Sequence, residues 1–285
     1  MPWLMRYLRD GGSALLAVAL CAAPAAAADM VWQAPVEVAA GGGHKGPWRM
    51  NRSAFLYVDD PTVAINADGV IAVAWADNAA QDIFLQVYDP DGAARYATPV
   101  RASRSGQVFS WLPRLVIGPG VTPEIFVLWQ EIIFSGGSHG GEVLFARSRD
   151  GGASFEAPVN LSNSTPGDGK GRLTARYWDN GSLDLVAAPE GTLFATWTEY
   201  DGRLWFTRSH DRGGSFSAPL LVGGDDARPA RGPSLAAGGG GRVHLAWTVG
   251  EDRAADIHFA SSADHGRSFS PPQVVFASDG HADAP

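Results

Sequence analysis

One short motif, Ser-x-Asp-x-Gly-x-Ser-Phe, occurs three times in the chain and sets the spacing of the segments around it. The copies read SRDGGASF at 148–155, SHDRGGSF at 209–216 and SADHGRSF at 262–269. Each copy follows an apolar segment that ends on tryptophan and precedes a strand-like segment with a proline near its start. A weaker fourth copy lies between 61 and 103, where Asp91 and Tyr96 take the places of the aspartate and the aromatic residue. The motif therefore marks a repeat of roughly 50–60 residues.

Each repeat contains four short strand patterns, A to D, with the motif between C and D. The chain has 35 glycines, 19 prolines and only 18% charged residues, which suits short strands joined by turns. Four-stranded units of this length predict an all-β fold, a β-propeller built of four-stranded blades. Tandem immunoglobulin-like sandwiches are the alternative, but they need about seven strands in roughly 100 residues.

The two ends of the repeat array differ from its interior. The segment MVWQAPVEVA (30–39) matches the strand D pattern although no strands A to C precede it, so it is predicted to close the ring. The segment GHADAP (280–285) resembles the start of a strand A. We therefore expect four complete blades plus an N-terminal closing strand, a shortened form of a five- or six-bladed propeller, with an incomplete or strained ring.

The N-terminus has the pattern of an export signal. Arg6 and Arg9 precede the Ala-rich apolar run 14–28, which is short for a membrane span. We predict a signal peptide over 1–28, a propeller domain over 29–285, and a periplasmic or secreted product. The only cysteine, Cys21, lies inside this signal; a lipoprotein is the alternative. A net charge of −8 argues against nucleic acid as a partner, and no other apolar run is long enough to span a membrane.

The motif itself has the composition of a hairpin turn. Its aspartate can accept hydrogen bonds from turn N–H groups, its glycines permit positive φ angles, and its aromatic residue can pack between hairpins. Copies in three blades would be spread around the rim, which is a poor arrangement for a catalytic carboxylate. A structural role is therefore predicted for Ser148, Asp150, Gly152, Phe155, Ser209, Asp211, Gly213, Phe216, Ser262, Asp264, Gly266 and Phe269.

These three copies resemble the Asp box, or BNR repeat, of the sialidase superfamily, and the resemblance covers roughly residues 30–285. It implies a propeller whose D–A and B–C connections lie beside a central funnel, on the face opposite the boxes. Those connections are long and rich in polar and aromatic residues in this sequence, for example 41–60, 103–113, 130–142 and 163–181. Long connections of this kind are usually functional.

The resemblance also implies a type of site. Sialidases clamp a substrate carboxylate with arginines and use a tyrosine nucleophile, its glutamate partner and an aspartate acid/base. The stretch Val58-Asp59-Asp60-Pro61 stands where the family has Phe/Tyr-Arg-Ile-Pro. The resulting candidates for catalysis are Asp77, Asp82, Glu199 and Tyr200. The candidates for substrate binding are Arg114, Arg176, Arg231, Asp60, Trp178 and His139.

On this basis we expect an exported propeller that binds an anionic glycan at the funnel face and hydrolyses a glycosidic bond in the manner of an exo-sialidase. The alternative is a non-catalytic propeller that binds a protein or a polysaccharide with the same loops, or an inactive shortened copy. No cofactor is expected, and no cluster of His, Cys or Asp has the spacing of a metal site. The sequence does not indicate an oligomeric state.

Overall fold

The computed structural model describes residues 34–41, 58–104, 109–135, 138–162, 172–173, 178–179, 182–199, 201–250 and 255–276. The chain divides into two compact units, 1–37 and 38–285, and all described strands belong to the second. The predicted signal over 1–28 lies outside the described residues. The closing strand expected over 30–39 is wrong for its described part, because residues 34–39 form no strand and Val36 stays 74% exposed.

Four antiparallel sheets of four strands follow one another along the chain, each with its strands in sequence order. The first sheet contains β1 (Val58–Ile65), β2 (Ile71–Asp77), β3 (Asp82–Tyr88) and β4 (Val100–Arg101). The second contains β5 (Phe109–Ile117), β6 (Ile125–Ser135), β7 (Ser138–Ser148) and β8 (Val159–Asn160). Between the second and third sheets, β9 (Arg172–Leu173) pairs with β10 (Trp178–Asp179).

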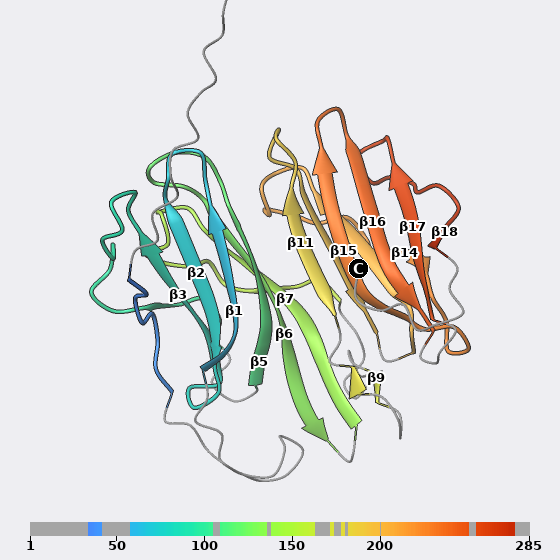
Figure 1. Ribbon diagram of the computed structural model, residues 1–285, viewed down its shortest axis with the longest axis horizontal. Helices are drawn as coiled ribbons and strands as arrows, with labels where there is room; N and C mark the ends of the chain where they lie inside the picture. The colour runs from blue at the N-terminus through green and yellow to red at the C-terminus, as the bar shows by residue number, and fades with distance from the viewer. Residues whose placement is uncertain are drawn as a thin grey trace, which may run out of the picture. The chain divides into compact units, whose positions relative to one another are not determined.

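The third sheet contains β11 (Leu183–Ala187), β12 (Leu193–Thr198), β13 (Leu204–Ser209) and β14 (Leu220–Gly223). The fourth contains β15 (Ala230–Gly238), β16 (Arg242–Val249), β17 (Asp256–Ser262) and β18 (Gln273–Phe276); its strands run side by side in Figure 1. These blade-like sheets confirm the predicted all-β propeller architecture. In the part of the chain that the structure describes, no helix is long and apolar enough to cross a membrane.

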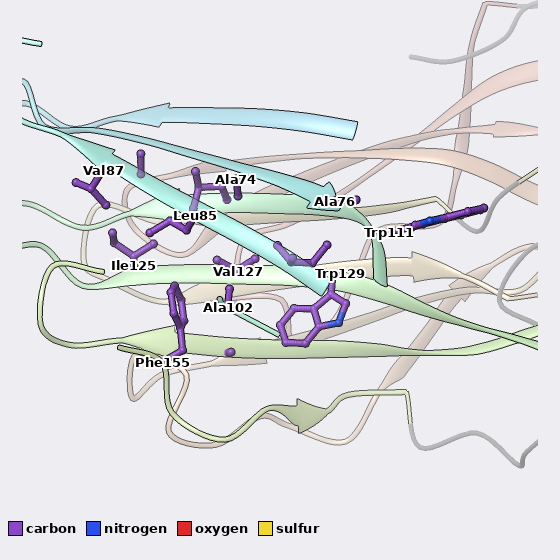
Figure 2. Close-up of a cluster of buried hydrophobic side chains, with 14 of the residues drawn as sticks. Ala74, Ala76, Leu85, Val87, Ala102, Trp111, Ile125, Val127, Trp129 and Phe155 are labelled. Atoms are coloured by element: carbon purple, nitrogen blue, oxygen red, sulfur yellow. The ribbon is translucent and has the colours of Figure 1, made fainter. Parts of the chain in front are cut away.

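Successive sheets pack face to face through three hydrophobic clusters. Because side chains alternate along a strand, each sheet presents one face to the preceding sheet and the other to the next. On β6, Val127 and Trp129 pack against the first sheet, whereas Phe126 and Leu128 pack against the third. Figure 2 shows the first of these clusters, and a third cluster joins the third sheet to the fourth. Among the described residues, no cluster joins the fourth sheet to the first.

The repeated motif forms the same hydrogen-bonded turn three times. In the second copy, the Ser209 hydroxyl donates to Asp211 at 2.7 Å and accepts from the Gly213 N–H at 2.7 Å. Asp211 also accepts from the N–H of Ser215 at 2.8 Å and from its hydroxyl at 2.7 Å. The copies at 148 and 262 repeat this pattern. The bonds from Ser215 and Ser209 hold the pKa of Asp211 well below its usual range.

Each motif also packs against the preceding sheet. Phe216 makes an edge-to-face contact with Phe145 of the second sheet, with ring centroids 4.8 Å apart. Phe269 makes the same contact with Phe206 of the third sheet at 4.9 Å. The third aromatic residue, Phe155, is buried in the first cluster. The motif is therefore a joint between sheets as well as a hairpin turn.

Side chains of the preceding sheet donate hydrogen bonds to the backbone of these joints. Arg147 donates to the carbonyl oxygen of Arg212 at 2.8 Å, and Arg208 donates to that of Gly266 at 2.5 Å. At the first joint, the Tyr96 hydroxyl donates to the Gly151 carbonyl oxygen at 2.9 Å. Tyr96, which has the place of the motif phenylalanine in the weak fourth copy, thus bonds forward to the next sheet, as the two arginines do.

Two connections predicted as loops contain regular structure instead. The segment 130–142 is largely a hairpin, because β6 continues to Ser135 and β7 begins at Ser138, with Phe134 paired to His139. The β-branched and aromatic residues of the EIIFS stretch favour this extension. Strand β5 begins at Phe109, inside the predicted connection 103–113. The polar connections opposite the motifs are therefore shorter than expected.

Candidate functional site

The candidate site lies at the ends of the first strands of the sheets, on the side away from the motifs. In an antiparallel sheet of order A to D, the A–B and C–D turns share one end and the B–C and D–A connections share the other. The first strands β1, β5, β11 and β15 contact one another in succession, so we call them the inner strands. Side chains at their starting ends can therefore meet those of the B–C connections.

Three inner strands start with the same unusual backbone. Asp60, Leu112 and Gly232 each precede a proline and have φ angles of 50°, 51° and 52°. A β-bulge occurs at each of these positions, and residues before proline ordinarily avoid this region. For Asp60 and Leu112 the conformation carries strain, which persists only where the surrounding structure enforces it. The bulges re-aim the side chains at this end of the inner strands.

The first two sheets are tied together at this end. The carboxylate of Asp60 accepts a hydrogen bond from the Leu112 N–H at 3.3 Å. The indole N–H of Trp111, which is 1% exposed, donates to the Asn78 side chain at 2.8 Å. Sequence reasoning did not select Trp111 or Asn78 as site residues. The one available signal was the tryptophan directly before Leu112-Pro113. Asp60 is therefore held at the boundary between the sheets.

Arg114 and Asp184 occupy equivalent positions on neighbouring inner strands. Arg114 pairs with Leu128 and Asp184 pairs with Thr196, in each case the residue before the repeated tryptophan. The Arg114 guanidinium donates to the Pro113 carbonyl oxygen at 3.2 Å, and none of the described carboxylates forms an ion pair with it. It still lies close enough to Asp184 to influence its pKa.

Asp184 is a desolvated carboxylate that sequence reasoning missed. It accepts hydrogen bonds from the N–H of Leu185 at 2.9 Å and from that of Leu235, on the next inner strand, at 2.7 Å. Burial raises the pKa of Asp184, while these two N–H groups and the charge of Arg114 act in the opposite direction. A single acid inside the apolar strand SLDLV was the signal for this position.

The second candidate cation, Arg231, is held by the protein itself. Its side chain is buried, and its Nε donates to the Gly250 carbonyl oxygen at 2.9 Å. Gly250 follows β16, so this bond ties the start of an inner strand to the adjoining B–C connection. The structure does not bring Arg231 and Arg114 into a shared ion pair with any described carboxylate.

The two acid/base candidates of the first sheet both make local contacts. Asp77 accepts hydrogen bonds from the N–H groups of Ala79 and Ala80, both at 2.9 Å, and so caps the turn after β2. Asp82 is fully buried; it accepts from the Ser103 hydroxyl at 2.6 Å and pairs with Arg101 at 3.1 Å. These contacts direct Asp82 toward the outer strand of its own sheet.

The remaining candidates are placed only in part. Glu199 accepts a hydrogen bond from the indole N–H of Trp197 at 3.3 Å, in the turn that leads to β13. The backbones of His139 and Trp178 lie in β7 and β10. Tyr200 and Arg176 lie outside the described residues. Within the described ranges, no group of three or more His, Cys, Asp or Glu side chains could hold a metal ion.

Comparisons with known proteins support the fold. No protein-family model and no curated protein matches the sequence. A protein of unknown function from Dyadobacter fermentans is 16% identical, with a TM-score of 0.55 over 77% of this chain and 70% of that one. An α-L-arabinanase from Penicillium chrysogenum, solved with arabinobiose, is 13% identical, with a TM-score of 0.52 over 79% of this chain and 68% of that one. The six-bladed β-propeller lectin of Aleuria aurantia is 13% identical, with a TM-score of 0.47 over 77% and 61%. At these identities the likeness concerns the fold alone.

Proposed function

We propose that the protein is a carbohydrate-binding propeller that holds an anionic glycan at the starting ends of its inner strands, through Arg114. The observation that carries this proposal is that the Arg114 guanidinium forms no ion pair with any described carboxylate. Arg101 and Arg147 are paired with Asp82 and Glu156, whereas Arg114, at the starting end of an inner strand, bonds to the Pro113 carbonyl oxygen and makes no ion pair with a described carboxylate. A guanidinium in this state is well suited to bind a carboxylate in a bidentate manner.

Two further observations support a glycan as the ligand. The fold resembles that of an arabinanase that was solved with a bound sugar. The repeated motif resembles the Asp box of the sialidase superfamily, so a glycan with a terminal carboxylate is the first ligand to test. Asp60 and Arg114 lie at the starting ends of the neighbouring inner strands β1 and β5. There Asp60 could accept a hydrogen bond from a sugar hydroxyl and Arg114 could bind a sugar carboxylate.

We expect Arg114→Gln to weaken binding of sialylated oligosaccharides at least tenfold, because a charge-assisted hydrogen bond contributes about 1.5–3 kcal/mol. Binding would be measured by calorimetry on the full chain. Arg149→Gln is the matched control, since Arg149 is an exposed variable position of the first motif and pairs with Glu156. A wild-type protein that binds no glycan of an anionic panel, or an Arg114→Gln variant that binds as wild type, would refute the proposal.

Hydrolysis is a second candidate function, favoured by the raised pKa of Asp184. A carboxyl group that stays protonated above its ordinary pKa can act as a general acid toward a leaving group. We expect sialidase-like release of a fluorogenic group to be lost in Asp184→Asn, while glycan binding changes little. The melting temperature should fall, because the amide oxygen can accept only one of the two N–H bonds from Leu185 and Leu235. Absence of release from sialosides and other glycosides by the folded wild type would leave binding as the function and exclude this one.

A further inference from the structure

Two sheet faces of the propeller have no partner sheet among the described residues. Each interior sheet buries one face against the preceding sheet and one against the next. The first sheet has nothing described before it, which leaves a face that we call the leading face: Val63, Ile65, Ile71, Val73, Trp75 and Phe84. The fourth sheet has nothing described after it, which leaves the trailing face: Ser234, Ala236, His244, Ala246, Ile257 and Phe259.

The leading face is apolar and partly open to solvent. Val63 and Ile65 are 66% and 65% exposed, and they pair across the strands with Val73 and Ile71. Trp75 stacks on Phe84, with ring centroids 6.3 Å apart. The end units of repeat arrays that face water usually carry a polar outer face, and exposed apolar patches on other proteins mark binding surfaces. The residues of the leading face thus suit a partner better than solvent.

The repeat itself shows which kind of surface covers such a face. At the first joint, the equivalent face of the second sheet, with Val127 and Trp129, packs against Ala74, Ala76 and Leu85 of the first sheet. The covering surface therefore has small residues on its second strand and large apolar residues on its third, as Figure 2 shows for this joint. This is the pattern of the trailing face of the first sheet.

The trailing face of the fourth sheet has that same pattern at the same register. Ala246 pairs with Phe259 as Ala74 pairs with Leu85. Thr248 pairs with Ile257 as Ala76 pairs with Ile83. Phe259 and Ile257 are only half-buried in the chain, whereas Leu85 and Ile83 are fully buried at the first joint. The trailing face of the fourth sheet therefore resembles the surface that covers the second sheet at the first joint.

We propose that the leading face of the first sheet binds the trailing face of the fourth sheet in a second copy of the chain. In the described structure Val63 and Ile65 of the leading face and Ser234 and Ala236 of the trailing face are exposed, although Trp75 is only 5% exposed, and a second copy would cover these exposed residues. Two copies related by a two-fold axis would satisfy both faces at once, and a head-to-tail arrangement that does not close would give longer assemblies. The inference does not depend on glycan binding.

The test uses one charged substitution on each face at an exposed position, so that folding is preserved. We expect the wild-type chain to self-associate in sedimentation velocity, and we expect Ile65→Arg and Ala236→Arg each to weaken that association at least tenfold. Val121→Arg is the control, because Val121 is 67% exposed but lies on the connection between β5 and β6 and belongs to neither face. Far-ultraviolet circular dichroism would check the fold, with Val63→Arg and Ser234→Arg as substitutes for a variant that fails it.

Mixing the two variants makes the test specific. Ile65→Arg retains an intact trailing face and Ala236→Arg retains an intact leading face, so an equimolar mixture should regain association that neither shows alone. A monomeric wild type, association that both variants leave unchanged, or a mixture that stays monomeric would each overturn the proposal. A monomeric mixture would mean that a leading face pairs with a leading face, or a trailing face with a trailing face, or that neither face lies in the interface.

Discussion

Gly213→Ala is expected to lower the free energy of unfolding by about 3 kcal/mol. Gly213 has a φ of +76°, where an alanine costs roughly 1–2 kcal/mol. An added Cβ would also lie 2.5 Å from Cζ and 2.6 Å from Cε1 of Phe145, a ring that is 1% exposed and packed against Phe216. Overpacking at such a joint costs about 1–3 kcal/mol more. Urea unfolding followed by tryptophan fluorescence would measure the loss.

Two other glycines separate the backbone cost from the packing cost. Gly240 has a φ of +71° but an added Cβ there meets nothing within 4 Å, so Gly240→Ala should lose only about 1 kcal/mol. Gly239 meets nothing within 4 Å and lies outside the left-handed region, so Gly239→Ala should be close to neutral. If Gly213→Ala were no less stable than Gly240→Ala, the joint between the second and third sheets would have to be loosely packed.

The local part of the fold could be predicted because the motif encodes it within a few residues. The turn closes through bonds from Ser209 to Asp211 and from Gly213 back to Ser209, all inside five positions. A hydrogen-bonded turn of this kind depends little on the rest of the chain, so its spacing predicts where strands must begin and end. Four sheets of four strands follow from that spacing.

The contacts between sheets could not be predicted in the same way, because they join residues far apart in the chain. Tyr96 and Gly151 are separated by 55 positions, and Arg147 and Arg212 by 65. Which side chain reaches the next turn depends on the face on which each residue lies, and therefore on strand register. The spacing of the motif predicts an aromatic residue at Tyr96, but only the structure shows that its hydroxyl donates to the following sheet.

The candidate site likewise depends on contacts between residues that are far apart in the chain. Arg114 and Asp60 could be selected as polar residues at strand starts. The importance of Asp184 depends on two facts that only the structure supplies: its register position matches that of Arg114, and its carboxylate accepts from Leu235 on the next inner strand. Arg231 remains a predicted ligand residue; its burial and its bond to Gly250 are likewise facts that only the structure supplies.

Asp82→Ala is expected to lower the free energy of unfolding, and its effect distinguishes a structural role of Asp82 from a catalytic one. Its carboxylate is fully buried between the Ser103 hydroxyl at 2.6 Å and Arg101 at 3.1 Å, and the same hydroxyl accepts from the Ile83 N–H at 2.8 Å. Asp82→Ala removes the acceptor for Ser103 and leaves a cavity. We expect a loss of about 2 kcal/mol in the free energy of unfolding. The cost stays below that of breaking a fully buried ion pair because Arg101 is 53% exposed and can be hydrated.

Asp82→Asn separates the hydrogen bond from the charge. Its side-chain oxygen can still accept from Ser103, so this variant should recover at least half of the stability that Asp82→Ala loses. Asp91→Ala is the control for removal of an acid from an exposed turn of the same sheet, where only the bond from the Ala93 N–H is lost. Asp82→Ala should leave glycan affinity unchanged at temperatures where the variant is folded, because a buried carboxylate bonded to the outer strand does not reach a ligand. Wild-type stability together with lost sialoside binding or release would instead make Asp82 a catalytic residue and would require its side chain to leave Ser103.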